Sequence, residues 1–554
     1  MPRSTTRSVV PSALNRRGFL LGTASVAGAG VLTACAGGGG EPGSSGSTAS
    51  GEPTTGGTLT VAFPADPENL DPHQRPQLYP RTITRQIADS LTDQDPETGE
   101  VIPWLASSWE ISDDVRTFTF TLRDDVTFSD GTPLTADVVT ANWERILEIG
   151  PLAYVAAGLL RDYSSSEVID SHTVSITFAN PNAQFLQATA SQSLAVLAPA
   201  TLALTPEEVA AGDVIGSGPY ILESYTPGED VVLTVREDYA WGSPLYANRG
   251  RGYVDRIEFS IIPEPTTMAG AVASGQIDFA YLLDVSVLST VESSDAELIG
   301  TDMPAIAIPI VPLVYRPIFA DERTRRALSL ATDREAIVDS VFEGRYQPAS
   351  AVLTKANPGW VDLSDQLAYD VDGAIALLEE AGWTTVGDDG LRSNDAGEPL
   401  RFEIQYTSAG TSSELMLQLL QQQWRAVGAD FVLTPVSTPS EANLHEYPFD
   451  ITTWSQTRAD ADVLRTVYSS FFENQSFLFD NADPELDGLL TELQTTVDAA
   501  ARLEVSGEAQ RLIVERGYSI PLYDLTQFSA ASSATSGAHA DIEGKPVLVD
   551  IWKP

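Results

Sequence analysis

The segment that decides the fold reads TFTFTL at residues 117–122 and SDGTPLTADVV at residues 129–139. In its first part, two phenylalanines and a leucine alternate with threonines, and this period of two is typical of a strand with one buried face. Residues 129–133 have the composition of a turn, and Thr135 stands where the cap of a helix is expected. The segment therefore predicts a strand, a turn and a helix in succession.

Similar patterns extend from this segment along the chain. A second alternating run, VSITF at residues 174–178, again places its apolar side chains on one face. Helix starts are expected at Thr205 and Thr332, because each threonine is followed three residues later by a glutamate, the pattern of a capping box. Further helices are expected over 372–382 and 414–428, each closed by a glycine. This alternation of strands and helices indicates the α/β class.

Length and charge limit the range of functions. The chain has 554 residues, more than one hydrophobic core usually holds, so at least two lobes are expected. Hydrophobic residues make up 43% of the chain, which excludes wholesale disorder. The formal net charge of −45 comes from 77 acidic and 32 basic residues, and such a field repels a polyanion. DNA and RNA are therefore excluded as partners.

Residue types that carry catalysis or bind metals are scarce and scattered. The single cysteine, Cys35, lies near the N-terminus. The four histidines are far apart in the sequence, with no pair at helical spacing: His73, His172, His445 and His539. The sequence also lacks the motifs of nucleotide hydrolysis, serine hydrolysis and dinucleotide binding. We therefore expect no catalytic residues, no metal site and no cofactor.

The N-terminal segment has the features of an export signal. Residues 1–34 contain arginines and no acid, in a chain that is otherwise strongly acidic. The pair Arg16-Arg17 and the apolar stretch after it are typical of a twin-arginine signal. The segment ends in LTAC at residues 32–35, which resembles the lipobox of bacterial lipoproteins. We interpret residues 1–34 as a signal peptide and Cys35 as a lipidation site; the alternative is a cysteine that stands there by chance.

Residues 35–57 are interpreted as a flexible linker. They consist mainly of glycine, serine, threonine and proline and cannot build a core. A coil of this length spans about 25 Å. A lipid on Cys35 would therefore hold an exported body at the outer, extracytoplasmic or periplasmic face of the cell membrane. The best later candidate for a membrane span, residues 303–315, is interrupted by three prolines.

From Thr58 to Tyr523 the chain resembles family 5 of the extracellular solute-binding proteins, the lipoproteins that serve ABC importers of oligopeptides, dipeptides and nickel. The motifs that carry the resemblance are NLDP (69–72), WLASSWE (104–110), FSDGTPLTADV (128–138), GSGPY (216–220), RRALSLATDR (325–334), LLEEAGW (377–383) and IPLY (520–523). Each motif alone is weak, whereas their order and spacing behind a lipobox are specific. We expect them to be structural, so they identify the fold and not the ligand.

The resemblance implies a periplasmic-binding-protein-like fold of two lobes, often called a Venus flytrap, with an extra subdomain in the first lobe. It places lobe I at residues 58–302 and its C-terminal completion at residues 525–554. Lobe II is expected at residues 303–524. The chain crossings between the lobes would act as a hinge, and the ligand would be buried when the lobes close.

The resemblance also points to a binding segment, FDITTWSQTR at residues 449–458. In many peptide-binding members, the third residue after the tryptophan is an aspartate that pairs with the α-ammonium group of the peptide. Here that position is Thr457, which gives up the charge-assisted hydrogen bond. Arg458 could receive a carboxylate or another anion, or it could pair at the surface with Asp460 or Asp462.

Other candidate contacts follow from the same resemblance. Trp454 would either stack on a ligand or line the lobe. Beyond the NLDP motif, His73, Gln77, Leu78 and Tyr79 would face the cleft, and Tyr79 is taken as a ligand contact. His73 would either bind a metal chelate or act as a hydrogen-bonding loop residue.

One further arginine, Arg145, is expected on the surface of the helix that follows the deciding segment. Glutamates at positions 144 and 148 stand close to it in the sequence. We therefore expect Arg145 to pair with Glu144 or Glu148.

The function expected from these features is the capture of a peptide or other small solute by an exported, lipid-anchored, monomeric protein. The protein would then deliver the solute to an ABC permease complex in the membrane. A metal chelate, a glycan or an anionic metabolite remain alternatives for the solute. The alternative from another class is a secreted, lipid-anchored hydrolase, for which the sequence offers no catalytic constellation.

Overall fold

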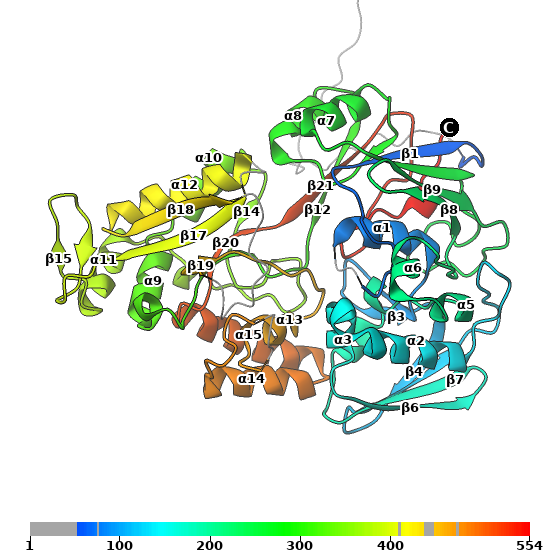
Figure 1. The fold of residues 1–554 in the computed structure, drawn as a ribbon, viewed down its shortest axis with the longest axis horizontal. Helices are drawn as coiled ribbons and strands as arrows, with labels where there is room; N and C mark the ends of the chain where they lie inside the picture. Colours follow the sequence, from blue (N-terminus) through cyan, green and yellow to red (C-terminus); the bar gives the residue numbers. More distant parts are fainter. Residues whose placement is uncertain (1–51, 75–76, 408–410, 437–447, 472–475) are drawn as a thin grey trace, which may run out of the picture. The chain divides into compact units, whose positions relative to one another are not determined.

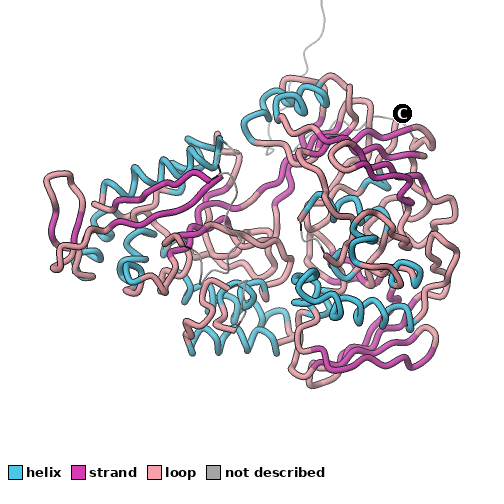
Figure 2. The backbone as a smooth tube through the Cα atoms, viewed as in Figure 1, coloured by secondary structure: helices cyan, strands magenta, loops and turns pink. Residues whose placement is uncertain are grey.

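The computed structural model of the chain describes residues 52–554, except 75–76, 408–410, 437–447 and 472–475. The expected signal peptide and Cys35 lie outside the described residues. Within the described part, no helix is both long and apolar enough to span a membrane. Helices and strands alternate along this part of the chain (Figure 2), which confirms the predicted α/β class.

The largest sheet has seven strands in the order β12-β21-β11-β1-β10-β9-β8 (Figure 1). Their bounds are β1 Thr58–Phe63, β8 Tyr220–Thr226, β9 Asp230–Val235, β10 Arg256–Ile261, β11 Phe279–Ala280, β12 Glu297–Asp302 and β21 Thr526–Ala531. Strand β1 is parallel to both of its neighbours, β10 and β11, whereas the other pairs are antiparallel. Leu59, Val61 and Phe63 of β1 are fully buried and pack with α1 (Leu78–Ile87) in one hydrophobic cluster.

The predicted strand, turn and helix form β5 (Thr117–Leu122) and α2 (Ala136–Ile149). Strand β5 lies in an antiparallel sheet of order β4-β5-β7-β6, with β4 Ala106–Ile111, β6 Tyr163–Asp170 and β7 Thr173–Phe178. The apolar face of β5 is buried in a cluster that includes residues of α2, as its alternation predicts. Thr135 is the N-cap residue of α2, but its side chain makes no capping hydrogen bond. Only the position of this predicted cap is therefore right.

A second group of elements surrounds a sheet of order β14-β20-β13-β19. Its strands are β13 Ile308–Pro312, β14 Gln347–Pro348, β19 Ile451–Thr452 and β20 Ile520–Asp524. Beside it, the parallel strands β17 (Arg401–Thr407) and β18 (Asp430–Val436) form a separate pair. The two helices predicted over 372–382 and 414–428 are α11 (Val371–Glu380) and α12 (Thr411–Ala426).

The two predicted capping boxes differ in their outcome. At α6 (Pro206–Ala210), Thr205 and Glu208 form the complete reciprocal pair. Helix α10 (Arg334–Phe342) is instead capped by Asp333, which accepts a hydrogen bond from the Ala336 N–H at 2.9 Å. The Thr332 hydroxyl is engaged elsewhere, because it donates to the Leu328 carbonyl at 2.7 Å and accepts a hydrogen bond from Trp424 Nε1 at 3.0 Å. The helix was therefore predicted correctly and its capping residue was not.

The remaining helices and strands complete these groups. They are β2 Thr92–Gln94, β3 Val101–Pro103, α3 Tyr154–Leu159, α4 Phe185–Ala188, α5 Pro199–Leu202, α7 Pro265–Ala273, α8 Leu288–Glu292, α9 Glu322–Leu330, β15 Thr385–Val386, β16 Arg392–Ser393, α13 Val463–Tyr468, α14 Pro484–Thr495 and α15 Ala499–Glu515.

The GSGPY motif packs directly against the end of α1. A Cβ atom on Gly216 would lie 2.2 Å from the Ile87 carbonyl oxygen, and one on Gly218 would lie 2.6 Å from the Gln86 carbonyl oxygen. Neither position has room for a side chain. These two glycines therefore serve the packing of α1 on the neighbouring backbone.

Two adjacent chain segments connect the seven-stranded sheet with the sheet of β13 and β20. Strand β12 continues into β13 through residues 303–307, and β20 continues into β21 through Leu525. The Met303 N–H donates to the Leu525 carbonyl at 2.9 Å, and the Thr526 hydroxyl donates to Asp302 Oδ1 at 2.6 Å. The chain thus passes between the two sheets twice at one place.

Candidate functional site

Residues 454–458 lie beside the first of these crossings. Thr457 pairs with Ala305 in an isolated β-bridge, and the Arg458 N–H donates to the Pro304 carbonyl at 2.8 Å. On the other side, Asn357 Nδ2 donates to the Arg458 carbonyl at 2.9 Å. The backbone that carries the predicted binding residues is therefore fixed to the crossing.

The side chain of Arg458 turns inward and is only 11% exposed. Its Nη1 donates to Thr466 Oγ1 at 3.1 Å and lies 3.5 Å from Asp462 Oδ2. Asp462 is already bound by Arg465 through two hydrogen bonds of 2.6 and 2.9 Å. Burial lowers the pKa of Arg458, and Asp462 opposes this only in part. Pairing with Asp462 was one of the two expected interpretations, but the pair lies inside the protein and not at its surface.

Trp454 and Tyr79 have no hydrogen bond or ring contact with each other in the described structure. Trp454 is 39% exposed, and its ring meets that of Phe477 edge-on with centroids 5.9 Å apart. Tyr79 lies half-buried in α1, where its ring centroid is 6.1 Å from that of Phe63. Burial raises the pKa of Tyr79. The predicted ligand contacts therefore occur on separate elements.

Arg145 does not lie on the helix surface, so that prediction is wrong. Its guanidinium group donates to Asp71 Oδ2 at 2.6 Å and Oδ1 at 3.3 Å, and to His73 Nδ1 at 2.7 Å. The side chains of Arg145 and Asp71 are 6% and 0% exposed. Arg145 belongs to the buried face of α2 and neutralises a carboxylate of the NLDP motif.

His73 is buried as well, so the expectation that it faces a cleft is wrong. Because Arg145 donates to Nδ1, the ring proton lies on Nε2 and is donated to the Ala195 carbonyl at 2.9 Å. Burial lowers the pKa of His73 to about 4; Asp71 acts in the opposite direction and Arg145 reinforces the decrease. Both ring nitrogens are thus occupied, and His73 is a hydrogen-bonding residue.

Next to Arg458, Ala459 makes a contact that the sequence analysis missed. Gln94, the last residue of β2, donates from Nε2 to the Ala459 carbonyl at 2.9 Å. The same Nε2 donates to the Gly99 carbonyl at 2.9 Å, and Gln94 Oε1 accepts a hydrogen bond from Gln187 Nε2 at 3.1 Å. The residue that follows the predicted binding segment is therefore joined to β2 and α4.

Gln94 and Gln187 border a small polar pocket. The other lining residues come from α1, β2, the segment after α4 and the C-terminal segment: Arg85, Asp93, Ala190, Asp541, Ile542, Glu543 and Lys545. Its volume of about 10 Å³ is room for roughly one water molecule. Gln187 Oε1 is buried and has no hydrogen-bond partner within the described structure.

One wall of this pocket is a buried charge cluster. Glu543 forms ion pairs with Arg81 and Lys545, and Lys545 also lies 3.1 Å from Asp541. Burial alone would raise the pKa of Glu543, but the two cations outweigh it and hold that pKa well below its usual range. The negative charge of Glu543 also acts on Arg458. The charge cluster at the pocket therefore contributes to the electrostatic environment of the predicted binding segment.

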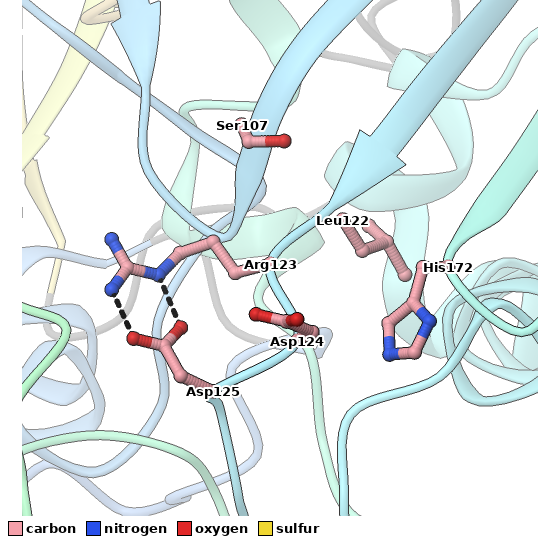
Figure 3. Close-up of a pocket in the computed structure, with 6 residues that line it drawn as sticks. All are labelled: Ser107, Leu122, Arg123, Asp124, Asp125 and His172. Atoms are coloured by element: carbon pink, nitrogen blue, oxygen red, sulfur yellow. Dashed lines mark hydrogen bonds and ion pairs between the residues drawn. The ribbon is translucent and has the colours of Figure 1, made fainter.

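A larger hollow of about 430 Å³ lies at the end of the β4-β5-β7-β6 sheet (Figure 3). Ser107, Leu122, Arg123, Asp124, Asp125 and His172 line it. Arg123 forms two hydrogen bonds with Asp125, of 2.8 and 2.6 Å, and both side chains are substantially exposed. The charges of such an exposed pair already bind each other and water. The pair therefore contributes little to the specific binding of a solute in this hollow.

A buried carboxylate marks the second crossing. Asp524 Oδ2 accepts the Lys355 N–H at 3.0 Å, whereas Oδ1 has no partner among the described residues. Burial raises the pKa of Asp524 to about 6; Lys355 opposes this shift and Asp302 adds to it.

The groups around Arg458 and the pocket form hydrogen bonds and ion pairs. In the described part of the chain, no three side chains of the metal-ligating types gather into a group that could hold an ion. The polar groups around Arg458 and the pocket are hydrogen-bond donors and acceptors from several elements. In this structure these groups largely satisfy one another, and the pocket has room for about one water molecule.

Comparisons with known proteins show which proteins the chain resembles. The family model "Bacterial extracellular solute-binding proteins, family 5 Middle" matches residues 100–477. The chain is 29% identical over 385 residues to the nickel-binding periplasmic protein of Escherichia coli K12, with 68% of this chain and 70% of the relative covered. It is 25% identical over 496 residues to the probable D,D-dipeptide-binding periplasmic protein DdpA of the same organism, with 86% and 90% covered.

The fold also matches solved structures. The crystal structure of NikA from Brucella suis in complex with Fe(III)-EDTA superposes with a TM-score of 0.77 at 23% identity. The match covers 90% of this chain and all of that protein (100%). The predicted fold class, α/β of the periplasmic-binding-protein type, is therefore confirmed.

Proposed function

This chain belongs to family 5 of the bacterial extracellular solute-binding proteins, and on that basis we propose that it captures a peptide or another small solute for an ABC importer. As a member of this family it is an extracytoplasmic solute-binding protein and not an enzyme, as the sequence analysis predicts. The proposal adds three features to this class of function: capture of the solute between two lobes, its delivery to the membrane permease, and attachment of the protein to the membrane.

The observation that carries the proposal is the pair of adjacent crossings at residues 303–307 and Leu525. Two crossings at one place allow two bodies to rotate about a common axis. We place lobe I at residues 58–302 and 525–554, and lobe II at residues 303–524. A solute bound to both lobes would favour the closed state by its differential affinity.

The chemistry around Thr457 and Arg458 supports a solute with an anionic group. Thr457 supplies no charge for an ammonium group, so the amine of a peptide would not be its main anchor. Arg458 is largely buried, and its nearest carboxylate is shared with Arg465. A bound carboxylate or similar anion would offset the free-energy cost of burying this cation. Trp454 and Tyr79 remain proposed contacts on the two lobes.

The proposed capture predicts a change in dimensions. We expect the protein with its co-purified solute, identified by native mass spectrometry, to have a smaller radius of gyration than the solute-free protein in small-angle X-ray scattering. A bound solute that leaves the radius of gyration unchanged would contradict closure.

The proposed role of Arg458 predicts a loss of affinity. Hydrogen bonds to charged groups contribute about 1.5–3 kcal/mol, so Arg458→Ala should weaken binding of an anionic solute at least about tenfold. Arg458→Lys keeps the charge but loses the planar fork, and Thr457→Asp adds repulsion, so both should also weaken binding. Calorimetry with the identified solute measures these affinities, and Arg401→Ala, at an exposed ion pair, is the control. If both Arg458 variants bind the solute with the affinity of the wild type, the role of Arg458 is purely structural.

The proposed anchor predicts a change in location. Cys35→Ala should remove the lipid acceptor and release the protein from the membrane fraction, or leave its signal peptide uncleaved. Mass spectrometry of the N-terminal peptide measures lipidation directly. An unlipidated wild-type N-terminus with unchanged membrane retention would disprove this part of the proposal.

A further inference from the structure

The side chain of Gln94 joins two segments that are 365 positions apart in the sequence. It is 2% exposed, and the Ala459 whose carbonyl it binds is 1% exposed. Because both groups are withdrawn from water, the hydrogen bond between them cannot be replaced by a bond to solvent while the contact persists.

The orientation of this amide is fixed by its partners. Nε2 faces two carbonyl oxygens, those of Gly99 and Ala459, each at 2.9 Å. A reversed amide would place Oε1 against these two acceptors. Gln187 Nε2 supplies the donor that Gln94 Oε1 requires, at 3.1 Å. Gln187 therefore holds Gln94 in the orientation that reaches Ala459.

The surroundings of Gln94 are closely packed on both sides. A Cβ atom on Gly99 would lie 2.7 Å from Pro358 Cγ, so the turn between β2 and β3 directly contacts this proline. The neighbouring Asn357 binds the Arg458 carbonyl at 2.9 Å. Three segments thus meet here: the turn after β2, residues 357–358 and residues 458–459.

We propose that Gln94 is a latch of the closed state, and that Gln187 is its positioning residue. This inference rests on the proposed two-lobe function, in which Gln94 and Ala459 belong to different lobes. Opening would separate the two groups and hydrate both of them. A net intramolecular hydrogen bond of this kind changes such an equilibrium by a factor of about five. The latch would therefore slow the release of a captured solute and limit spontaneous opening.

The test uses hydrogen exchange of the full-length, solute-free protein measured by mass spectrometry. Gln94→Met keeps the length and volume of the side chain but removes both donors and the acceptor. We expect exchange in peptides around residues 95–101 and 455–463 to become about fivefold faster. Gln187→Met should change the same peptides in the same direction by a smaller factor. Gln94→Asn, which is one methylene too short, serves as a second variant if Gln94→Met does not fold.

The matched control is Gln192→Met. Gln192 is as deeply buried as Gln94, but it donates to the Ala88 carbonyl at 3.2 Å and to Thr84 Oγ1 at 3.5 Å, so its side-chain bonds among the described residues stay within the proposed lobe I. Exchange around residues 455–463 should therefore stay at the wild-type rate in this variant. If Gln94→Met and Gln192→Met change those peptides equally, Gln94 is not a latch. The scattering experiment on the wild type tests closure itself, so a failure of the proposed function is recognised separately.

Discussion

Replacing Arg145 by methionine is expected to lower the free energy of unfolding by about 3–5 kcal/mol, the usual cost of leaving a buried charge without its partner. Asp71 has no exposed side-chain surface (0%) and receives two hydrogen bonds from Arg145. Methionine fills much of the volume of the arginine but offers the carboxylate no charge. Urea denaturation at pH 7 measures the difference.

The control for this prediction is Arg123→Met. Arg123 and Asp125 form a comparable two-bond pair, but their side chains are 32% and 52% exposed. Such a surface pair contributes about 0–1 kcal/mol. Equal losses in the two variants would mean that burial does not govern these ion pairs.

The second large effect is expected for Glu543→Gln. This change leaves Arg81 and Lys545 buried beside a neutral amide, so we again expect a loss of about 3–5 kcal/mol. The C-terminal segment should also open locally and become sensitive to proteases, because Glu543 fixes this segment to α1. Urea denaturation and limited proteolysis measure the two effects.

The dependence of this loss on pH has a defined sign. The pKa of Glu543 is lowered in the folded protein from an ordinary value of 4.5. The stabilisation by its carboxylate is therefore fully present above pH 4.5 and decreases as the pH falls below that value. The free energies of unfolding of the wild type and the variant should therefore converge at acidic pH. A difference that is independent of pH, or a similar loss in the exposed control Glu237→Gln, would contradict the assignment.

The elements that could be predicted from the sequence are those specified by local patterns. Strand β5 and helix α2 follow from an alternation and a capping position within 33 residues of chain, 117–149. Arg145 was assigned wrongly because sequence neighbours suggested Glu144 and Glu148 as partners. The signal that could have corrected this is its helical spacing: it follows Asn142 by three positions, and both residues lie on the buried face of α2.

The candidate site was less accessible to sequence reasoning. The family resemblance identified the segment of Thr457 and Arg458, but it did not show which way the Arg458 side chain turns. Gln94, Gln187 and Glu543 belong to no recognisable motif, because each has a decisive partner that is distant in the sequence: Ala459, Gln94 and Arg81, respectively. Burial determines how strongly each of these groups contributes to stability. It is a property of the folded chain alone.

The central place of β1 in its sheet determines how the body responds to mechanical force. Strand β1 is paired in parallel with β10 from Thr58↔Arg256 to Phe63↔Ile261, and with β11 on its other edge. A pull on the chain ahead of Thr58 acts along the strand, so it loads the hydrogen bonds of both edges in shear and at the same time. The bonds cannot then open one after another, as they would in a peeled hairpin. The force needed to extend the body from this end should therefore be larger than the force needed to peel off an edge strand such as β8.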